Sequence, residues 1–132
     1  MPLLEIVTPP GYIIPGLSQG VLADGRLLFL SGHVPLDSEG KLIAPGQLEP
    51  QMVAIYENLK ITLAAAGATF DNIVKLTTFI VGLTPEALPI VRGVRNRYVN
   101  TARPPASTLL GVSALFHPEC VAEVEAIAVL PR

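Results

Sequence analysis

Cysteine is almost absent from the chain, and this bears on where the protein works. Cys120 is the only cysteine among 132 residues, so no disulfide can form within the chain. A chain without internal disulfides fits a reducing compartment better than secretion, and we expect a cytoplasmic protein. Cys120 also has no basic or histidine partner at a spacing that suits catalysis, which disfavours thiolate chemistry.

Long apolar runs and a basic leader are also missing. No apolar run approaches the length that crosses a bilayer. The segment from Met1 to Gly16 contains several prolines and no basic residue, which is unlike a secretory signal. We therefore expect a protein that does not associate with membranes.

The sequence has few of the residues that bind metals or nucleic acids. His33, His117 and Cys120 do not have metal-ligand spacing, and no glycine-rich phosphate loop occurs, so we expect neither a metal nor a cofactor. His117 lies in the turn Phe116-His117-Pro118-Glu119-Cys120 and is expected to be structural. The net charge is −2, tryptophan is absent, and the three tyrosines and four phenylalanines are scattered. This composition argues against a nucleic-acid surface.

Apolar residues, in contrast, are abundant. Half of the residues are hydrophobic and only 15% are charged. A chain of this length suits one domain over residues 1–132, and no linker or repeat divides it. Because this apolar content exceeds what a small monomer can bury, we expect part of it to lie between subunits.

The first half of the chain predicts strands followed by a helix. Residues 1–16 are expected to form an irregular lead-in. Asp24-Gly25 lies between the apolar runs 21–23 and 26–30, which is a strong signal for a β-hairpin. Apolar residues at helical spacing predict a helix over about residues 50–66, with Gly67 ending it.

The second half predicts a strand, a helix and two more strands. Residues 72–83 are rich in β-branched side chains, and Thr84-Pro85 then suits the start of a helix that runs to about Asn100. The runs at about 106–114 and 121–130 are so apolar that they predict strands buried on both faces. The expected fold is α+β, with one mixed sheet covered by two helices on one face. A symmetric oligomer could cover the other face.

Several short motifs along the chain resemble one known family. They are Gln19-Gly20-Val21, Leu30-Ser31-Gly32-His33-Val34-Pro35, Glu57-Asn58-Leu59, Pro105-Ala106-Ser107-Thr108, and the stretch from Val121 to Val129. Together they are similar to landmarks of the RidA/YjgF family of reactive-intermediate deaminases. The resemblance implies a chorismate-mutase-like fold and barrel-like homotrimers that bind small molecules in clefts between subunits. Several members hydrolyse enamines and imines released by pyridoxal-phosphate enzymes.

The resemblance also identifies positions where this chain departs from the family. Active members carry an arginine that clamps the substrate carboxylate where this chain has Ser107. Leu109 stands where active members often have a cysteine, and Leu17 aligns with a family tyrosine. These changes remove the usual anion clamp and make the expected pocket more apolar.

Other pocket positions keep polar side chains. Glu123 aligns with the family's acidic residue that handles water, and Arg92 aligns with a pocket asparagine and is a candidate for a relocated clamp. Ser31 and Gly32 suit close approach of the backbone to a ligand, and His33 replaces a family glutamine beside them. Structural roles remain open for Arg92, as a surface residue of a basic helix end, and for His33, as a loop histidine.

Imine hydrolysis needs a group that first takes a proton from water and then gives one to the departing amine. A carboxyl group whose pKa is raised by burial can do both. Glu123 lies in an apolar strand and suits this role, whereas Glu125, two residues further along the same face, is expected to be structural. A solvated pair on an exposed sheet edge is the alternative.

Three functions remain open from the sequence. The first is an imine or enamine hydrolase of altered specificity, and the second is a non-catalytic trimer that binds small apolar metabolites or protects partners. The third, an endoribonuclease or translation inhibitor, is disfavoured by the charge and the aromatic content. A buried Glu123 that faces Arg92 or His33 would favour the first function, and a solvated Glu123 would favour the second.

Overall fold

The computed structural model describes residues 3–132, so the first two residues of the predicted lead-in lie outside the described residues. The strands and helices, in chain order, are β1 Leu4–Val7, β2 Gly20–Ala23, β3 Arg26–His33, α1 Leu48–Ala65, β4 Ile73–Val81, α2 Leu88–Asn96, β5 Ala106–Val112 and β6 Ala122–Leu130. Short 3-10 turns, η1 Phe70–Asn72 and η2 Pro85–Ala87, precede β4 and α2.

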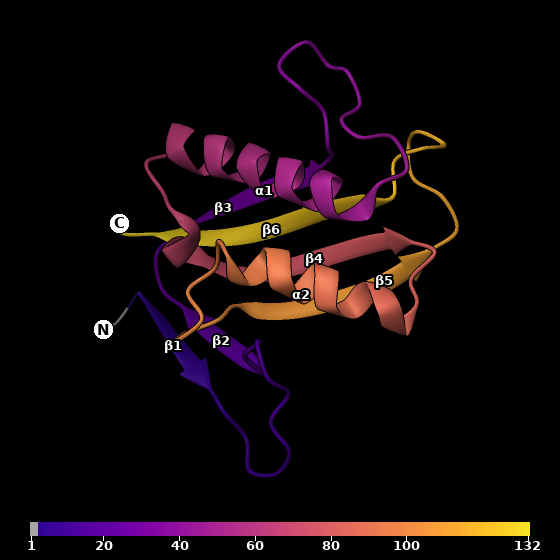
Figure 1. Cartoon of the computed structure of the whole chain (residues 1–132). Coiled ribbons are helices and arrows are strands. Elements are labelled where there is room, and N and C mark those ends of the chain that lie inside the picture. Colours follow the sequence, from indigo (N-terminus) through magenta and orange to yellow (C-terminus); the bar gives the residue numbers. More distant parts are fainter. Residues whose placement is uncertain (1–2) are drawn as a thin grey trace.

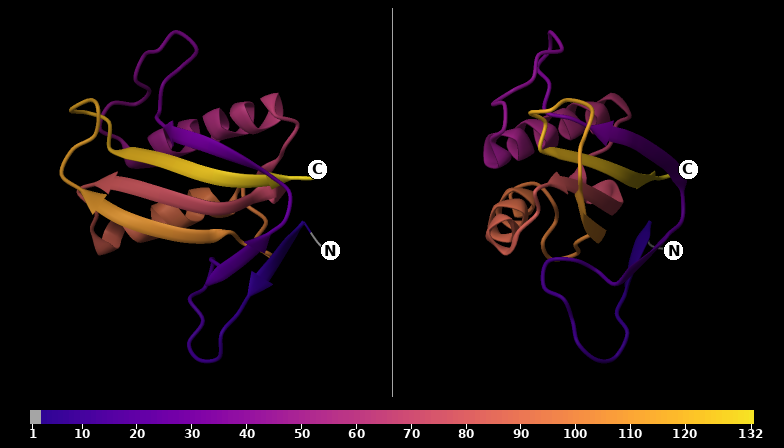
Figure 2. Two further views of the ribbon diagram at one scale, coloured as in Figure 1. Left: turned by 180° about the vertical axis from the view of Figure 1, so that it is seen from behind. Right: turned by 90° about the vertical axis from the view of Figure 1, so that its right-hand side faces the viewer.

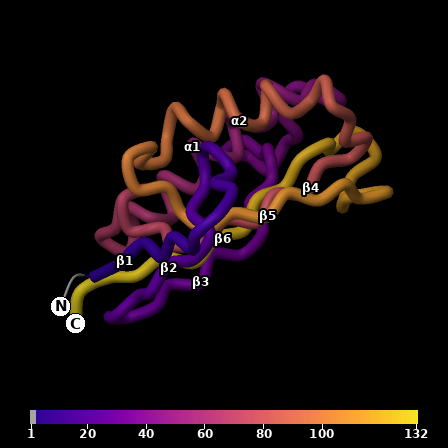
Figure 3. The backbone as a smooth tube through the Cα atoms, turned by 90° about the horizontal axis from the view of Figure 1, so that it is seen from below, coloured from indigo at the N-terminus to yellow at the C-terminus, as the bar shows by residue number. Residues whose placement is uncertain are grey.

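The main body of the molecule has two layers, a sheet and a pair of helices, and β1 and β2 form a separate two-stranded sheet. Four strands form the main sheet in the order β3-β6-β4-β5, in which only β4 and β5 are parallel. Both helices lie on the same side of this sheet, and the other side faces away from them (Figures 1 and 2). The view from below shows the same layering (Figure 3). The predicted α+β fold, with a mixed sheet and helices on one face, is confirmed.

The core lies between the helices and the sheet because each element presents one apolar face there. From α1 it receives a stripe at helical spacing, Met52, Ile55, Tyr56, Leu59 and Leu63. From the sheet it receives alternate residues of the central strands, Leu76, Ile80, Ala122, Val124, Ala126 and Ala128 among them.

A buried glutamine holds the start of α1 to the loops around it. Gln51 is completely buried, and its side-chain amide nitrogen donates to the carbonyl oxygens of Ile43, Ala44 and Glu119. Its side-chain oxygen accepts a hydrogen bond from the backbone N–H of Val121 at 2.8 Å. This one side chain therefore links the loop before α1 to the segment that leads into β6.

The predicted hairpin at Asp24-Gly25 is wrong. β2 pairs with β1, and β3 pairs with β6, so this dipeptide marks the passage from one sheet to another. The expected irregular lead-in is also wrong over Leu4–Val7, because this segment forms β1 and supplies the partner of β2. The helix expected to reach about Asn100 ends earlier, since α2 stops at Asn96.

The expectation that both closing strands are buried on both faces is wrong for β5. No residue of β5 is fully buried, and Leu110 is 39% exposed. In β6 the residues facing the helices are buried, whereas Glu123 is half-buried and Glu125 is exposed. The reason is the arrangement of the sheet, because β5 lies at its edge and both helices cover the same single face (Figure 2).

Candidate functional site

A β-bulge at the end of β3 creates the first part of the site. Leu30 lies opposite Ala126, but the next paired residue of β3 is His33, opposite Val124. Three steps along β3 therefore match two steps along β6, and the bulge is formed by Ser31 and Gly32. Both residues are exposed.

Glu123 lies beside this bulge on the face of the sheet that the helices do not cover. Its register partner on β4 is Phe79. The carboxylate lies so close to the backbone of Gly32 that a Cβ atom there would overlap it. Glycine at position 32 thus provides the space that the carboxylate occupies.

The electrostatic surroundings of Glu123 favour its protonated form. Burial raises the pKa of the Glu123 carboxyl, and the nearby Glu125 raises the pKa further. A carboxyl whose pKa lies above its ordinary value exchanges protons more readily near neutral pH. Glu123 is therefore suited to act first as a base and then as an acid.

His33 does not share the surroundings of Glu123. Its Nε2 atom is 2.7 Å from the Thr62 hydroxyl on α1, and its Nδ1 atom is 2.6 Å from the Ser31 carbonyl oxygen. Since a carbonyl oxygen only accepts, Nδ1 carries the proton, and in the neutral ring Nε2 accepts from Thr62. Nε2 thereby links β3 to α1, and Nδ1 holds the ring against the backbone of β3.

The second part of the site is a small cavity of about 80 Å³ on the helix side of the sheet. It lies between the loop before β2, the strands β4 and β5, and the helix α2. Its lining includes four of the predicted site residues, Leu17, Arg92, Ser107 and Leu109, and five further residues, Ile14, Pro15, Thr78, Val91 and Arg95.

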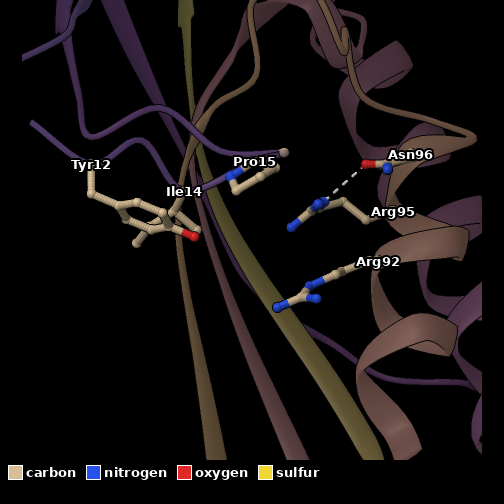
Figure 4. A pocket seen from close by; sticks show the side chains of 7 residues that line it. Tyr12, Ile14, Pro15, Arg92, Arg95 and Asn96 are labelled. Atoms are coloured by element: carbon tan, nitrogen blue, oxygen red, sulfur yellow. Dashed lines mark hydrogen bonds between the residues drawn. The ribbon is translucent and has the colours of Figure 1, made fainter. Parts of the chain in front are cut away.

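A larger cavity of about 360 Å³ adjoins the first and shares residues with it. It is lined by Tyr12, Ile14, Pro15, Gly16, Arg92, Arg95 and Asn96. Both arginine side chains extend from α2 toward the loop that carries Tyr12, Ile14 and Pro15 (Figure 4). The lining of this cavity contains cationic but no acidic side chains, so it suits an anion.

The predicted site residues therefore form two groups on opposite faces of one sheet. Thr78 lines the small cavity, and the next residue, Phe79, is the register partner of Glu123. Because neighbouring strand residues point to opposite faces, Glu123 cannot reach the arginine cavity of its own chain. The single chain does not bring Glu123 to face Arg92 or His33.

Arg95 is the residue of this region that sequence reasoning missed. It is 8% exposed, although arginine is rarely buried this deeply. One signal could have identified it, because Arg92 and Arg95 are three positions apart and so share a helix face next to the apolar residues Val91 and Val94.

Two other features of the described chain bear on its function class. Within residues 3–132, no group of three or more His, Cys, Asp or Glu side chains is placed to hold a metal ion. None of the helices there is both long and apolar enough to span a membrane. Cys120 is buried, and burial raises the pKa of its thiol, which disfavours the thiolate.

Comparison with known proteins agrees with this architecture. The family model described as Endoribonuclease L-PSP matches residues 12–130. Protein DfrA of Myxococcus xanthus is 41% identical over 113 residues, which are 85% of this chain and 83% of that protein. The human 2-iminobutanoate/2-iminopropanoate deaminase is 33% identical over 128 residues, 96% of this chain and 88% of the human protein.

A solved structure gives the same result for the fold. The Yersinia pestis protein YyfB, described as a protein of unknown function of the conserved Rid family, superposes with a TM-score of 0.90 at 32% identity. The match covers 97% of this chain and 99% of YyfB. The resemblance predicted from the motifs is confirmed, and the chain belongs to the RidA/YjgF family, whose model bears the description Endoribonuclease L-PSP.

Proposed function

We propose that this protein hydrolyses the imines, or the enamine tautomers, of 2-oxo acids, at sites formed between copies of the chain in a homotrimer. The observation that carries the proposal is the half-buried Glu123 carboxyl, whose pKa is raised and which lies over Gly32. The name of the human relative, a deaminase of 2-iminobutanoate and 2-iminopropanoate, supports the substrate class.

The reaction consumes one water and releases ammonia. The substrate reacts as its protonated imine, C=NH2+. Glu123 accepts a proton from water while the water oxygen bonds to the C=N carbon, and the π electron pair moves to nitrogen, which becomes a neutral amine. The carboxyl then returns its proton to that nitrogen, the C–N bond breaks as the hydroxyl oxygen forms the C=O bond, and the hydroxyl proton passes through the Glu123 carboxylate to the departing ammonia, leaving a 2-oxo acid and ammonium. Positioned acid–base groups of this kind accelerate proton transfer by about 10²–10⁴-fold.

The substrate carboxylate needs a cation, and Arg92 is the residue we assign to it. Ser107 can donate one hydrogen bond to the same group, but it cannot form the charged, bidentate contact that arginine forms. Arg92 and Ser107 line the same small cavity. Leu17 and Leu109 complete that cavity with apolar surface and favour a substrate with carbon atoms beyond the imine.

Assembly of several copies would bring the two parts of the site together. Glu123 and the arginine cavity are on opposite faces of the sheet, so a second copy is required for both to contact one small molecule. The uncovered face also exposes apolar side chains, Leu27 at 53%, Phe29 at 69% and Leu110 at 39%. Burial of such surface is a common driving force for symmetric assembly.

A direct assay tests the hydrolysis. 2-Iminopropanoate is generated in solution by an amino-acid oxidase, and its disappearance is followed with the natural protein, with Glu123→Gln and with Ser107→Arg. Glu125→Gln is the matched control, because it removes the same charge from the same strand face two residues away. We expect rapid loss of the imine with the natural protein and with the control, and a loss of activity in Glu123→Gln of about 10²–10⁴-fold.

Other outcomes would point elsewhere. Activity that appears only in Ser107→Arg would mean that Glu123 can still activate water. It would also mean that the natural substrate lacks the carboxylate that 2-iminopropanoate carries. Full activity in Glu123→Gln would contradict the assigned role of the carboxyl. Inactivity of every variant with several imines would favour the non-catalytic binding protein.

A further inference from the structure

Arg95 is buried without the partner that a buried charge normally has. Its side chain is 8% exposed, and its Nη2 atom has no hydrogen-bond partner among the described residues. The one hydrogen bond that its side chain donates within the described chain runs from Nε to the side-chain oxygen of Asn96, at 3.2 Å. A buried guanidinium that lacks a carboxylate is unfavourable unless something else compensates for it.

No acid of the described chain compensates for it. The ion pairs formed within residues 3–132 involve neither Arg92 nor Arg95. Burial lowers the pKa of Arg95, and the positive charge of the nearby Arg92 lowers it further, whereas Tyr56 acts in the opposite direction. Two cations that share a cavity wall without an acid create a strong preference for an anion there.

The loop before β2 is shaped around this arginine. Gly16 has a φ of +86°, a conformation that glycine adopts readily and other residues rarely do. A Cβ atom at this position would also overlap Nη2 of Arg95. The loop thus lies directly against the guanidinium group, and it carries Tyr12, whose side chain lines the larger cavity.

The two cavities adjoin, because Ile14, Pro15, Arg92 and Arg95 line both of them, and we refer to the pair as the track. Ser107 lines only the smaller cavity, and Tyr12 and Asn96 line only the larger one. A molecule held by Arg92 at its first carboxylate would therefore extend past Arg95 into a space with further hydrogen-bonding groups.

We propose that this track selects a dianionic substrate, a 2-imino acid whose side chain ends in a second acidic group that Arg95 and Tyr12 bind. The inference rests on the proposed imine hydrolysis for the identity of the reacting group. The second acidic group itself follows from the two arginines, the absence of acids from the lining of both cavities and the adjoining larger cavity.

Binding of stable product analogues tests this without any turnover. Isothermal titration at constant ionic strength compares 2-oxoglutarate with 2-oxohexanoate, which has a similar length but only one carboxylate. A charged, hydrogen-bonded contact predicts that 2-oxoglutarate binds at least about tenfold more tightly to the natural protein. Arg95→Met should abolish this preference, so that the two acids bind the variant with affinities within about twofold of each other.

The matched control is Arg97→Met, which removes the same charge from the C-terminal end of the same helix. Arg97 is exposed, pairs with Glu49 at 3.8 Å and does not line either cavity, so its loss should leave the preference unchanged. Equal affinity of the natural protein for both acids would overturn the inference, and so would a preference that survives Arg95→Met. The first comparison needs no variant and so does not depend on how any variant folds.

The result is distinguishable from a failure of the proposed function. If the protein prefers the dianion but hydrolyses no imine, the proposed dianion site is supported and the proposed hydrolase function is refuted. Hydrolysis of imines without any preference for the dianion would refute only the dianion site.

Discussion

The carboxylate of Glu123 on β6 lies against the backbone of Gly32 on β3, in space that any other residue at position 32 would fill. Gly32→Ala should displace the carboxylate while leaving the core untouched, because position 32 is exposed. We expect kcat/KM for imine hydrolysis to fall by at least about tenfold, since small displacements of reacting groups are costly.

The control for this substitution is Gly93→Ala. Gly93 lies in α2, and a Cβ atom there would meet nothing within 4 Å. This change should stabilise the protein by about 0.5–1 kcal/mol and leave kcat/KM unaltered, because alanine favours the helix more than glycine does. Full activity in Gly32→Ala would show that the contact between Gly32 and Glu123 does not position the carboxyl.

The raised pKa of Glu123 predicts how stability depends on pH. Burial raises the pKa of this carboxyl in the folded protein, so folding favours its protonated form. Its contribution to stability is fully present below the pKa of the unfolded chain and is lost as the pH rises through the folded pKa. Glu123→Gln should therefore melt at a higher temperature than the natural protein at pH 8, and at a similar temperature at pH 4.

The same electrostatics predicts a shift in the activity profile. The charge of Glu125 helps to raise the pKa of Glu123. Glu125→Gln should therefore move the acidic limb of the kcat/KM profile to lower pH, which is measured by assays between pH 4 and 8. An acidic limb that stays in place would mean that another group titrates there.

Gln51 makes the buried linkage between α1 and the two loops beside it, and its loss should destabilise the folded protein. Gln51→Met keeps the volume but leaves three carbonyl oxygens and the N–H of Val121 without this partner. We expect the free energy of unfolding in urea to fall by about 2–3 kcal/mol. Gln47→Met, at an exposed position whose side chain makes no cap hydrogen bond, should change it by less than about 0.5 kcal/mol.

His33 should behave as a structural residue. Thr62→Val removes the hydroxyl that donates to His33 Nε2 and should lower the free energy of unfolding by about 1 kcal/mol. Because neither His33 nor Thr62 lines either cavity, KM for the imine should be unchanged. A rise in KM with unaltered stability would instead place His33 in the substrate site.

Local sequence patterns predicted the helix α1 and the strand β4, because each depends on the spacing of nearby residues. The apolar stripe of α1 and the β-branched run of β4 each match their element closely. The pairing of β2 with β1 rather than with β3 could not be predicted, because the Asp24-Gly25 signal is local and the competing partner lies near the start of the chain. The family motifs then supplied the architecture that periodicity alone left open.

Part of the grouping of the candidate site residues could be predicted, but the arrangement of the whole candidate site could not. Leu17, Arg92, Ser107 and Leu109 do lie together, as the resemblance implied. The bulge that turns His33 toward α1 has no signature in the order of residues. The spacing of Arg92 and Arg95 indicates that they share a helix face, but it does not show how deeply Arg95 is buried. Both depend on how distant segments pack, which a single sequence does not state.

Subunit complementation is the most direct test of a site shared between copies of the chain. Glu123→Gln and Arg92→Met are each expected to be inactive alone, and the two are then co-expressed so that mixed trimers form. If each site combines Glu123 of one subunit with Arg92 of its neighbour, random assembly restores about a quarter of the sites. The mixed trimers should then hydrolyse the imine at about a quarter of the rate of the natural protein. If both residues served the same site from one chain, the mixed trimers would remain as inactive as either variant alone.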